Sequence, residues 1–185
     1  MIDETIKETR RRMETTIENV RNEFGKLRTG KASPALLDGI VVDYYGSKMP
    51  IRQVANVSAP EPRLLVIQPW EKPMLTEIEK AILKSDLGLN PSNDNIVIRI
   101  PIPQLTQERR EDLVKVAKKI AEENKVAIRN VRRDANDKLK KAEKDHDISE
   151  DELHRSMDTI QEITDQYTNK VEELLIKKEE DIMEI

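Results

Sequence analysis

Apolar side chains recur every three or four residues along three long stretches of the chain. This spacing predicts amphipathic α-helices, because 3.6 residues complete each helical turn and one face becomes apolar. The first predicted helix begins near the N-terminus and ends near Thr29 and Gly30. Its apolar stripe is Ile2, Ile6, Met13, Ile17, Val20, Phe24 and Leu27.

Two further helices are predicted in the C-terminal half. One begins after Thr106, a candidate N-cap, and the other begins at Ser149, where Glu152 completes a capping box. The second stripe is Leu113, Ala117, Ile120, Asn124, Ala127, Val131, Ala135, Leu139 and Ala142, and the third is Leu153, Met157, Ile160, Thr164, Tyr167, Val171, Leu174 and Ile182. Since nothing else covers the three apolar faces, they predict a long antiparallel three-helix bundle.

The middle of the chain follows a different pattern. Every proline, and every glycine except Gly25, lies between residues 30 and 104. The predicted elements there are strands at Ile40–Tyr45, Leu64–Ile67 and Ile96–Ile100, a turn at Gly46 and a short helix at Pro73–Lys84. The predicted fold class is therefore α+β, with a small β/α/β domain inserted into the bundle.

The predicted domain boundaries follow from this change of pattern. The bundle comprises residues 1–29 and 106–185, and the inserted domain comprises residues 30–105. The chain crosses between them twice, near Gly30 and near Gln104 and Leu105. Two crossings permit a hinge while they limit free tumbling.

Composition narrows the function classes. The chain has no cysteine, which excludes disulfides, thiolate nucleophiles and cysteine-bound metals. Aromatic residues make up 3% of the chain, and Tyr44, Tyr45 and Trp70 are too few to form a platform for stacked RNA bases. No apolar run is long enough for a membrane span or a secretory signal, so we expect a soluble cytoplasmic protein that does not bind membranes.

Charge is distributed unevenly, although the formal net charge is only −4. Residues 106–147 carry 13 basic and 10 acidic side chains, whereas residues 148–185 carry 4 basic and 12 acidic ones. When Val131 is set toward the core, seven cations of the second predicted helix fall in a sector about 100° wide on the far side. These cations are Lys115, Lys118, Lys125, Arg129, Arg132, Arg133 and Lys140, and only Glu122 interrupts them.

The basic sector favours a polyanionic partner. Seven like charges repel one another, whereas a helix face that is merely solvated usually mixes both signs. Arg129, Arg132 and Arg133 stand at i, i+3 and i+4, so their three guanidinium groups project together and can bind phosphates bidentately. The alternatives are an ordinary solvated face, or a non-enzymatic helical adaptor or chaperone that binds an acidic protein.

Signals for catalysis are weak. The segment Gly25–Ala32 falls one residue short of a phosphate-binding loop, because Ala32 stands where a hydroxyl must hold magnesium. This segment also closes a helix, whereas a phosphate-binding loop opens one. His146 and His154 lack a third metal ligand at short spacing. We therefore expect no catalytic residue, no metal and no cofactor.

Five segments resemble the ribosome recycling factor family, and the likeness covers nearly all 185 residues. They are Leu27–Leu37, Val42–Gly46, Ser85–Pro91, Leu105–Arg110 and Ala127–Asn136. The resemblance implies an L-shaped protein of the size of a tRNA, in which a three-helix bundle and a β/α/β domain are joined by a hinge. This architecture agrees with the one predicted from the residue patterns.

The resemblance also implies a task and partners. Members of this family bind the ribosome after termination and, with elongation factor G and its GTP, split it into subunits, releasing mRNA and tRNA. The residues implied to contact large-subunit ribosomal RNA are Arg28 on the first helix, Lys31 in place of a family arginine, and Arg129, Arg132 and Arg133 on the second helix. Candidates for further phosphate contacts are Lys118, Lys125 and Lys140. The inserted domain is implied to meet elongation factor G, and we expect a monomer.

One departure from the family pattern concerns the second crossing. Gln104 stands where a second proline commonly follows Pro103, and glutamine lacks the restraint that proline places on φ. We expect a wider spread of interdomain angles than in a Gln104→Pro variant, because proline narrows the backbone ensemble. Small-angle X-ray scattering of both proteins measures this spread, and equal spreads would refute the prediction.

Overall fold

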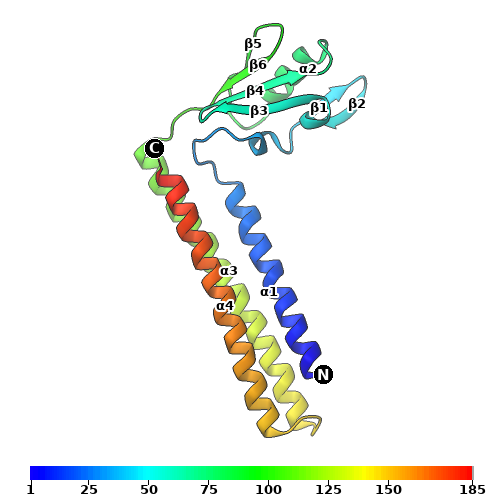
Figure 1. The fold of residues 1–185 in the computed structure, drawn as a ribbon, viewed down its shortest axis with the longest axis vertical. Helices are drawn as coiled ribbons and strands as arrows, with labels where there is room; N and C mark the ends of the chain where they lie inside the picture. Colours follow the sequence, from blue (N-terminus) through cyan, green and yellow to red (C-terminus); the bar gives the residue numbers. More distant parts are fainter. Residues whose placement is uncertain (185) are drawn as a thin grey trace. The chain divides into compact units, whose positions relative to one another are not determined.

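The computed structural model describes residues 1–184 and divides the chain into two compact units. One unit comprises Met1–Leu27 and the chain from Gln107 onward, and the other comprises Arg28–Thr106. The first unit is helical, and the described strands all belong to the second (Figure 1). None of the helices in the described part of the chain combines the length and apolar composition that crossing a membrane requires.

The helical unit is a three-helix bundle, as the apolar stripes predict. It consists of α1 (Ile2–Gly25), α3 (Gln107–Lys144) and α4 (Glu150–Met183), which run side by side (Figure 1). The bundle core contains fully buried side chains from every helix, among them Ile17, Ile128 and Ile160. Each such side chain contributes roughly 1.5–3 kcal/mol relative to an exposed one, so the apolar seam dominates the stability of the bundle.

Some core positions of α3 and α4 differ by one residue from the predicted stripes. The buried residues are Ala121, Ile128 and Leu175, where the spacing predicted Ile120, Ala127 and Leu174. Ile120, Ala127 and Leu174 are half-buried, so they lie at the edge of the apolar seam, one residue before the side chain that fills it. The predicted and observed stripes agree again further along the helices, at Asn124, Val131 and Ile182.

Several polar side chains in the bundle core have satisfied hydrogen bonds, whereas the buried Asn136 Oδ1 has no hydrogen-bond partner in the described part of the chain. The buried hydroxyls of Thr5 and Thr9 donate to backbone carbonyls one turn earlier, at 3.0 and 2.7 Å. Asn124 donates through Nδ2 to the Ile120 carbonyl at 2.8 Å, and its Oδ1 accepts from Asn19 Nδ2 at 3.0 Å. The last contact links α3 to α1, which stabilises one relative position of the two helices.

α1 ends at Gly25, earlier than the predicted end near Thr29. The backbone N–H groups of Lys26 and Leu27 donate to carbonyls only three residues back, so the last turn tightens and stops. Gly25 is also among the weakest helix formers. The expectation that Arg28 lies on the first helix is consequently wrong, because that residue follows the helix end.

The connection between α3 and α4 is made by two local capping motifs. His146 adopts a positive φ of 62°, and the Asp147 N–H donates to the Ala142 carbonyl at 2.8 Å, which terminates α3. α4 begins with the predicted capping box. The Ser149 hydroxyl accepts from the Glu152 N–H at 3.1 Å, and the Glu152 carboxylate accepts from the Ser149 N–H at 2.7 Å.

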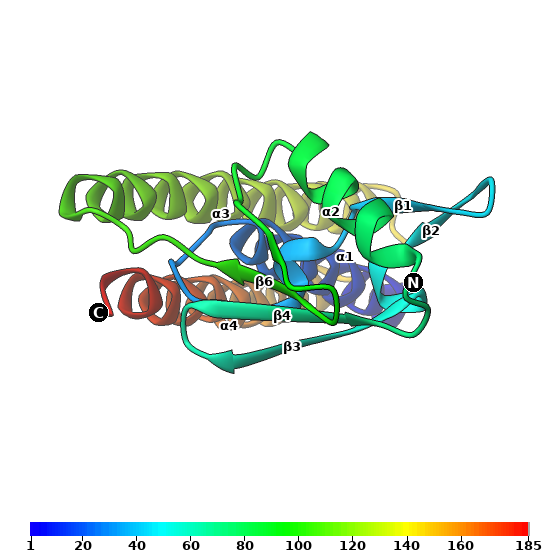
Figure 2. The ribbon, with the colours of Figure 1, turned by 90° about the horizontal axis from the view of Figure 1, so that it is seen from above.

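The second unit contains two antiparallel sheets. In the smaller sheet β1 (Val41–Tyr44) pairs with β2 (Ser47–Pro50). In the larger sheet the order is β3 (Ala55–Glu61), β4 (Leu64–Pro69), β6 (Ile98–Pro101) and β5 (Ser92–Asn93). Figure 2 shows β3, β4 and β6 of this sheet. The helical elements are α2 (Met74–Lys84) and two short 3-10 turns, η1 (Pro34–Leu37) and η2 (Ile51–Gln53).

One apolar cluster joins the larger sheet to α2. Alternate residues of the central strands point to the same side, and Ile67 on β4 and Ile98 and Ile100 on β6 are fully buried. Ile78 and Ile82 on α2 pack into the same cluster. The predicted central strands and the predicted helix were recognisable because these residues carry the alternating or helical apolar pattern.

β2, β3 and β5 were not predicted, because their side chains are mostly polar or exposed. β3 contains Pro60 and fully buries only Ala55, so its pairing with β4 depends on backbone hydrogen bonds that a polar sequence does not reveal. β6 begins at Ile98 and not at the predicted Ile96. Ile96 lies in the preceding turn, where the Asp94 carboxylate accepts from its backbone N–H at 3.0 Å.

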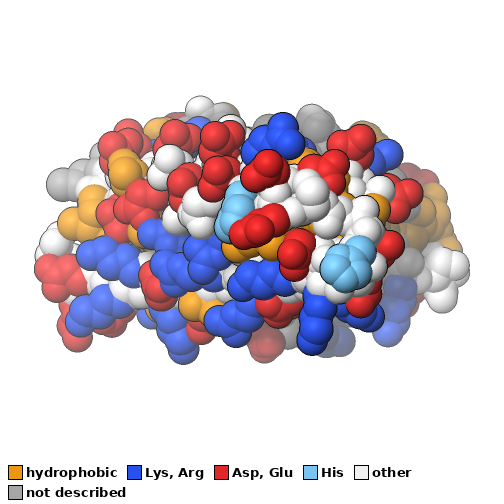
Figure 3. Space-filling model, turned by 90° about the horizontal axis from the view of Figure 1, so that it is seen from below, with side chains coloured by type: hydrophobic (Ala, Val, Ile, Leu, Met, Phe, Trp, Pro, Cys, Tyr) orange, Lys and Arg blue, Asp and Glu red, His pale blue; other side chains and the backbone are white. Residues whose placement is uncertain are grey.

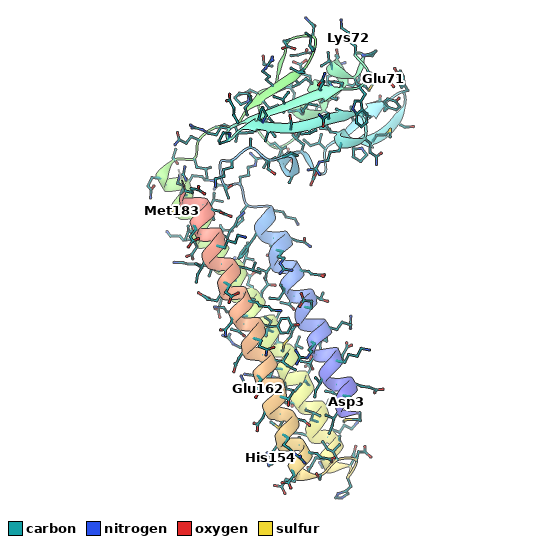
Figure 4. The ribbon with its side chains drawn as sticks, in the orientation of Figure 1. Asp3, Glu71, Lys72, His154, Glu162 and Met183 are labelled. Atoms are coloured by element: carbon teal, nitrogen blue, oxygen red, sulfur yellow. The ribbon has the colours of Figure 1, made fainter. Side chains whose placement is uncertain are left out.

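Glu71 binds the hairpin formed by β1 and β2 through two hydrogen bonds. Its carboxylate accepts from the hydroxyls of Tyr44 at 2.6 Å and Tyr45 at 2.8 Å, and the two rings meet edge to face. Tyr44 is half-buried against the apolar cluster, whereas Tyr45 is 69% exposed in the turn, with a φ of 49°. Gly46 completes this predicted turn with a φ of 89°. Glu71 lies just before α2 (Figure 4), so the hairpin is tied to that connection.

The capping box should contribute measurably to the stability of the bundle. We expect Ser149→Ala to lower the free energy of unfolding by about 1 kcal/mol, because the backbone N–H of Glu152 at the start of α4 loses its hydrogen-bond acceptor. Urea denaturation followed by circular dichroism measures the change. Ser149→Asp keeps an acceptor at the N-cap and should stay near wild type, and equal stability of the two variants would argue against the capping role.

The tyrosine pair should govern the acidity of Glu71. Hydrogen bonds from Tyr44 first and Tyr45 second hold the pKa of Glu71 below its ordinary value of 4.5. Because the folded state binds this proton more weakly than the unfolded state, the stabilising contribution is present above pH 4.5 and is lost as the pH falls through the lower folded pKa.

NMR titration of the Glu71 carboxyl carbon tests this relationship. We expect Tyr44→Phe to raise the pKa of Glu71 toward its ordinary value, and Tyr45→Phe to raise it by less. Tyr167→Phe in the bundle is the control and should leave the pKa of Glu71 unchanged. An unaltered titration in Tyr44→Phe would count against the hydrogen bond as the cause.

Candidate RNA-binding face of the bundle

The predicted cations of α3 lie on the side of the helix that faces away from the core. Val131 and Ala135 are buried. Arg129, two residues before Val131, and Arg133, between the two buried residues, are exposed. Figure 3 views the bundle from the end at which α3 joins α4. Lys and Arg side chains gather along one side of this end and Asp and Glu along the other, in keeping with a basic α3 and an acidic α4.

The three arginines differ in how they are held. Arg132 is half-buried, and its Nη1 donates to Gln161 Oε1 on α4 at 3.3 Å. Arg129 Nη1 lies 3.4 Å from the Glu122 carboxylate, a contact between two exposed side chains that contributes little energy in water. The structure brings these guanidinium groups to one side of α3, as the spacing predicts.

The three predicted lysines divide into two kinds. Lys118 and Lys140 are exposed. Lys125 is only 18% exposed, and its Nζ lies 2.5 Å from the Glu172 carboxylate on α4. A phosphate would have to compete with that carboxylate, so Lys125 is the least accessible to RNA of the three.

Two predicted contacts lie outside the helical unit. Arg28 belongs to the second unit, and its Nη1 donates to the Leu87 carbonyl at 2.7 Å. Lys31 is exposed in the same unit. Neither residue therefore extends the basic face of α3 within the bundle, and their contact with RNA stays a prediction.

The two chain segments that contain the predicted hinge residues bind the turn between β3 and β4. The Ala32 N–H donates to the Pro62 carbonyl at 2.6 Å, and the Ile102 N–H donates to the Arg63 carbonyl at 2.8 Å. Gln104 Oε1 also accepts from Arg63 Nη1 at 2.9 Å. This side-chain contact gives Gln104 an attachment to the sheet that proline cannot make.

Gly30 is required where the two crossing segments meet. Its φ of 78° is strained for other residues, and a Cβ atom there would lie 3.1 Å from Leu105 Cγ. Leu105 is half-buried. The first and second crossing segments are therefore neighbours within the second unit.

Three residues of the helical unit were missed by sequence reasoning. Gln161 and Glu172 contact the cations of α3 from positions 29 and 47 residues away, so no local spacing indicates them. Arg110 looks like one more surface cation, yet it is buried, and its Nη1 donates to the carbonyls of Ile182 at 2.8 Å and Glu184 at 2.6 Å. It satisfies acceptors at the C-terminal end of α4.

The two histidines are explained by their local structure. The described residues contain no group of three or more His, Cys, Asp or Glu side chains placed to hold a metal ion. His146 serves the turn after α3, and His154 lies on the exposed side of α4, where Figure 4 marks it near the end of the bundle. Both positions are explained by the local structure.

Comparison with known proteins gives consistent matches along the chain. Residues 20–183 match the model of the family described as ribosome recycling factor. The ribosome-recycling factor of Carboxydothermus hydrogenoformans is 58% identical over 185 residues, and that of Halothermothrix orenii is 55% identical over 185 residues. Both matches cover 100% of this chain and 100% of the relative.

Two solved structures are also similar over nearly their whole length. A solution structure of a ribosome recycling factor has a TM-score of 0.80 and 42% identity, and the match covers 100% of this chain and 98% of that one. A second structure describes the T. thermophilus ribosome recycling factor and the E. coli elongation factor G bound to the E. coli post-termination complex. It has a TM-score of 0.66 and 49% identity and covers 99% of both chains.

Proposed function

This chain belongs to the ribosome recycling factor family, and on that premise we propose that it recycles ribosomes after translation termination. It binds the post-termination ribosome and, together with elongation factor G, separates it into subunits, which releases mRNA and tRNA. The observation that carries this function is the full-length similarity to ribosome recycling factors, one of which is bound with elongation factor G to a post-termination complex.

Within this function, the basic side of α3 is the surface that binds large-subunit ribosomal RNA. Arg129, Arg132 and Arg133 project from two successive turns on the side away from the bundle core. Guanidinium groups match the geometry of phosphate oxygens and form charge-assisted hydrogen bonds with them. Exposed Lys118 and Lys140 extend the positive surface along the same helix.

The acidic α4 complements this surface. The chain has a net charge of −4, so long-range attraction to RNA does not come from the molecule as a whole. Residues 148–185 carry 12 acidic and 4 basic side chains, and they repel RNA from the neighbouring side of the bundle. The side of the bundle formed by α4 is therefore unfavourable for RNA, whereas the basic side of α3 is favourable.

The role requires no catalytic residue in this chain. The segment Gly25–Ala32 spans the end of α1 and the crossing that follows it, which is not the strand-to-helix turn in which a phosphate-binding loop works. The GTP that drives splitting is bound and hydrolysed by elongation factor G. This chain supplies a rigid helical body that is held on RNA while the partner moves.

Sucrose-gradient sedimentation of post-termination ribosomes tests the function. With this protein, elongation factor G and GTP, we expect conversion to subunits, and omission of either protein should leave the ribosomes intact. Arg132→Ala should weaken ribosome binding by roughly 10- to 100-fold, because a charge-assisted hydrogen bond contributes about 1.5–3 kcal/mol.

The control variant is Arg155→Ala, which removes the same charge from the exposed side of α4. It should bind and split ribosomes like the wild type, and both variants should keep the wild-type melting temperature. Absence of splitting with both factors present would overturn the proposed function. Normal binding by a folded Arg132→Ala protein would move the RNA contact away from α3.

A further inference from the structure

α4 presents two different kinds of partner to the cations of α3. Opposite Lys125 it places a carboxylate, with Glu172 Oε2 2.5 Å from the ammonium group. Opposite Arg132 it places an amide, with Gln161 Oε1 3.3 Å from the guanidinium Nη1. The first partner carries a full negative charge and the second carries none.

This difference decides how much positive charge remains for a phosphate. The carboxylate of Glu172 neutralises Lys125, and the lysine side chain is only 18% exposed beside it. The amide oxygen of Gln161 accepts a hydrogen bond but leaves the charge of Arg132 intact. A guanidinium has five N–H donors, so one bond to Gln161 leaves the others available to phosphate oxygens.

Asp165 sets the orientation of the Gln161 amide. Gln161 Nε2 donates to Asp165 Oδ1 at 2.9 Å, one helical turn further along α4. An amide has a donor end and an acceptor end, so anchoring its NH₂ group on Asp165 turns its oxygen toward Arg132. The three side chains form a chain of hydrogen bonds from Asp165 through Gln161 to Arg132.

An arginine that is already held loses less side-chain freedom when it binds. Immobilising a long side chain at an interface costs roughly 0.5–1.5 kcal/mol. Most charged residues of α4 are acidic, and a glutamate at position 161 would neutralise Arg132. Glutamine has the same length as glutamate and accepts a hydrogen bond from Arg132, but it carries no charge. Position 161 is therefore suited to presenting this arginine to an anion.

We propose that Gln161, oriented by Asp165, is a positioning residue for Arg132 in binding RNA phosphate, whereas Glu172 withholds Lys125 from the same RNA. This inference rests on the proposed function, because it takes ribosomal RNA as the partner of α3. According to this inference, side chains of α4 determine which cations of α3 are available to bind RNA.

Salt-dependent binding to purified large ribosomal subunits provides the test. We expect Gln161→Glu to weaken binding by about tenfold, since it replaces a phosphate contact by an internal ion pair. The slope of log affinity against log salt should fall by about 0.9, the value for one lost phosphate contact. Glu172→Gln should do the opposite, with tighter binding and a slope larger by about 0.9.

Matched variants separate positioning from other effects. Gln166→Glu makes the same chemical change at another exposed position of α4 and should leave affinity and slope near wild type. Gln161→Met keeps the length of the side chain without the acceptor, and it should weaken binding by about threefold with an unchanged slope. In an Arg132→Ala background, Gln161→Glu should cause no further loss.

The possible results distinguish this inference from the proposed function. If Arg132→Ala weakens binding but Gln161→Glu binds with wild-type affinity and slope, the positioning role is wrong and the RNA-binding face stands. A Gln161→Glu effect that persists in full without Arg132, or that Gln166→Glu reproduces, also overturns the positioning role. If Arg132→Ala itself binds normally, the proposed RNA-binding face fails instead.

Discussion

The apolar faces of α1, α3 and α4 can leave water only by packing against one another. Side chains such as Ile17, Ile128 and Ile160 are fully buried in the resulting seam. Once one side of α3 is committed to this seam, its opposite side must face solvent, and that side carries Arg129 and Arg133. The position of the basic surface is thus a consequence of core packing, and the rigidity of the seam makes the surface a fixed one.

The two neighbouring helices α3 and α4 carry opposite charge, so the basic surface is confined to one side of the bundle. α3 and α4 lie against each other over their length, yet one is rich in cations and the other in anions. Some of the opposite charges pair, as Lys125 and Glu172 do. Those that do not pair define where a polyanion can lie. The positive charge of a chain with a net charge of −4 is thus concentrated along one helix, which is the surface proposed above to bind RNA.

The parts of the fold that the sequence predicted are those determined within a few residues. The capping box at Ser149 and Glu152, the alternation in β6 and the apolar stripes all depend on local spacing, and the structure contains them. β3 was missed because its pairing comes from β4 and not from its own polar side chains. Gln161 and Glu172 were missed because their contacts join residues far apart in the chain. The candidate site was thus predictable as a row of cations, but their partners on the adjacent helix were not.

The two crossing segments lie close together, which determines how the second unit is inserted into the chain. Gly30 lies close enough to Leu105 that a Cβ atom would crowd it, and the β3–β4 turn accepts hydrogen bonds from the backbone of both segments, at Ala32 and Ile102. A segment whose two ends meet can be added to a host chain, or removed from it, without stretching the host. The β-containing unit would therefore need only a short peptide to join its own two ends. The second unit is one continuous stretch of chain, whereas the bundle is assembled from two separate stretches.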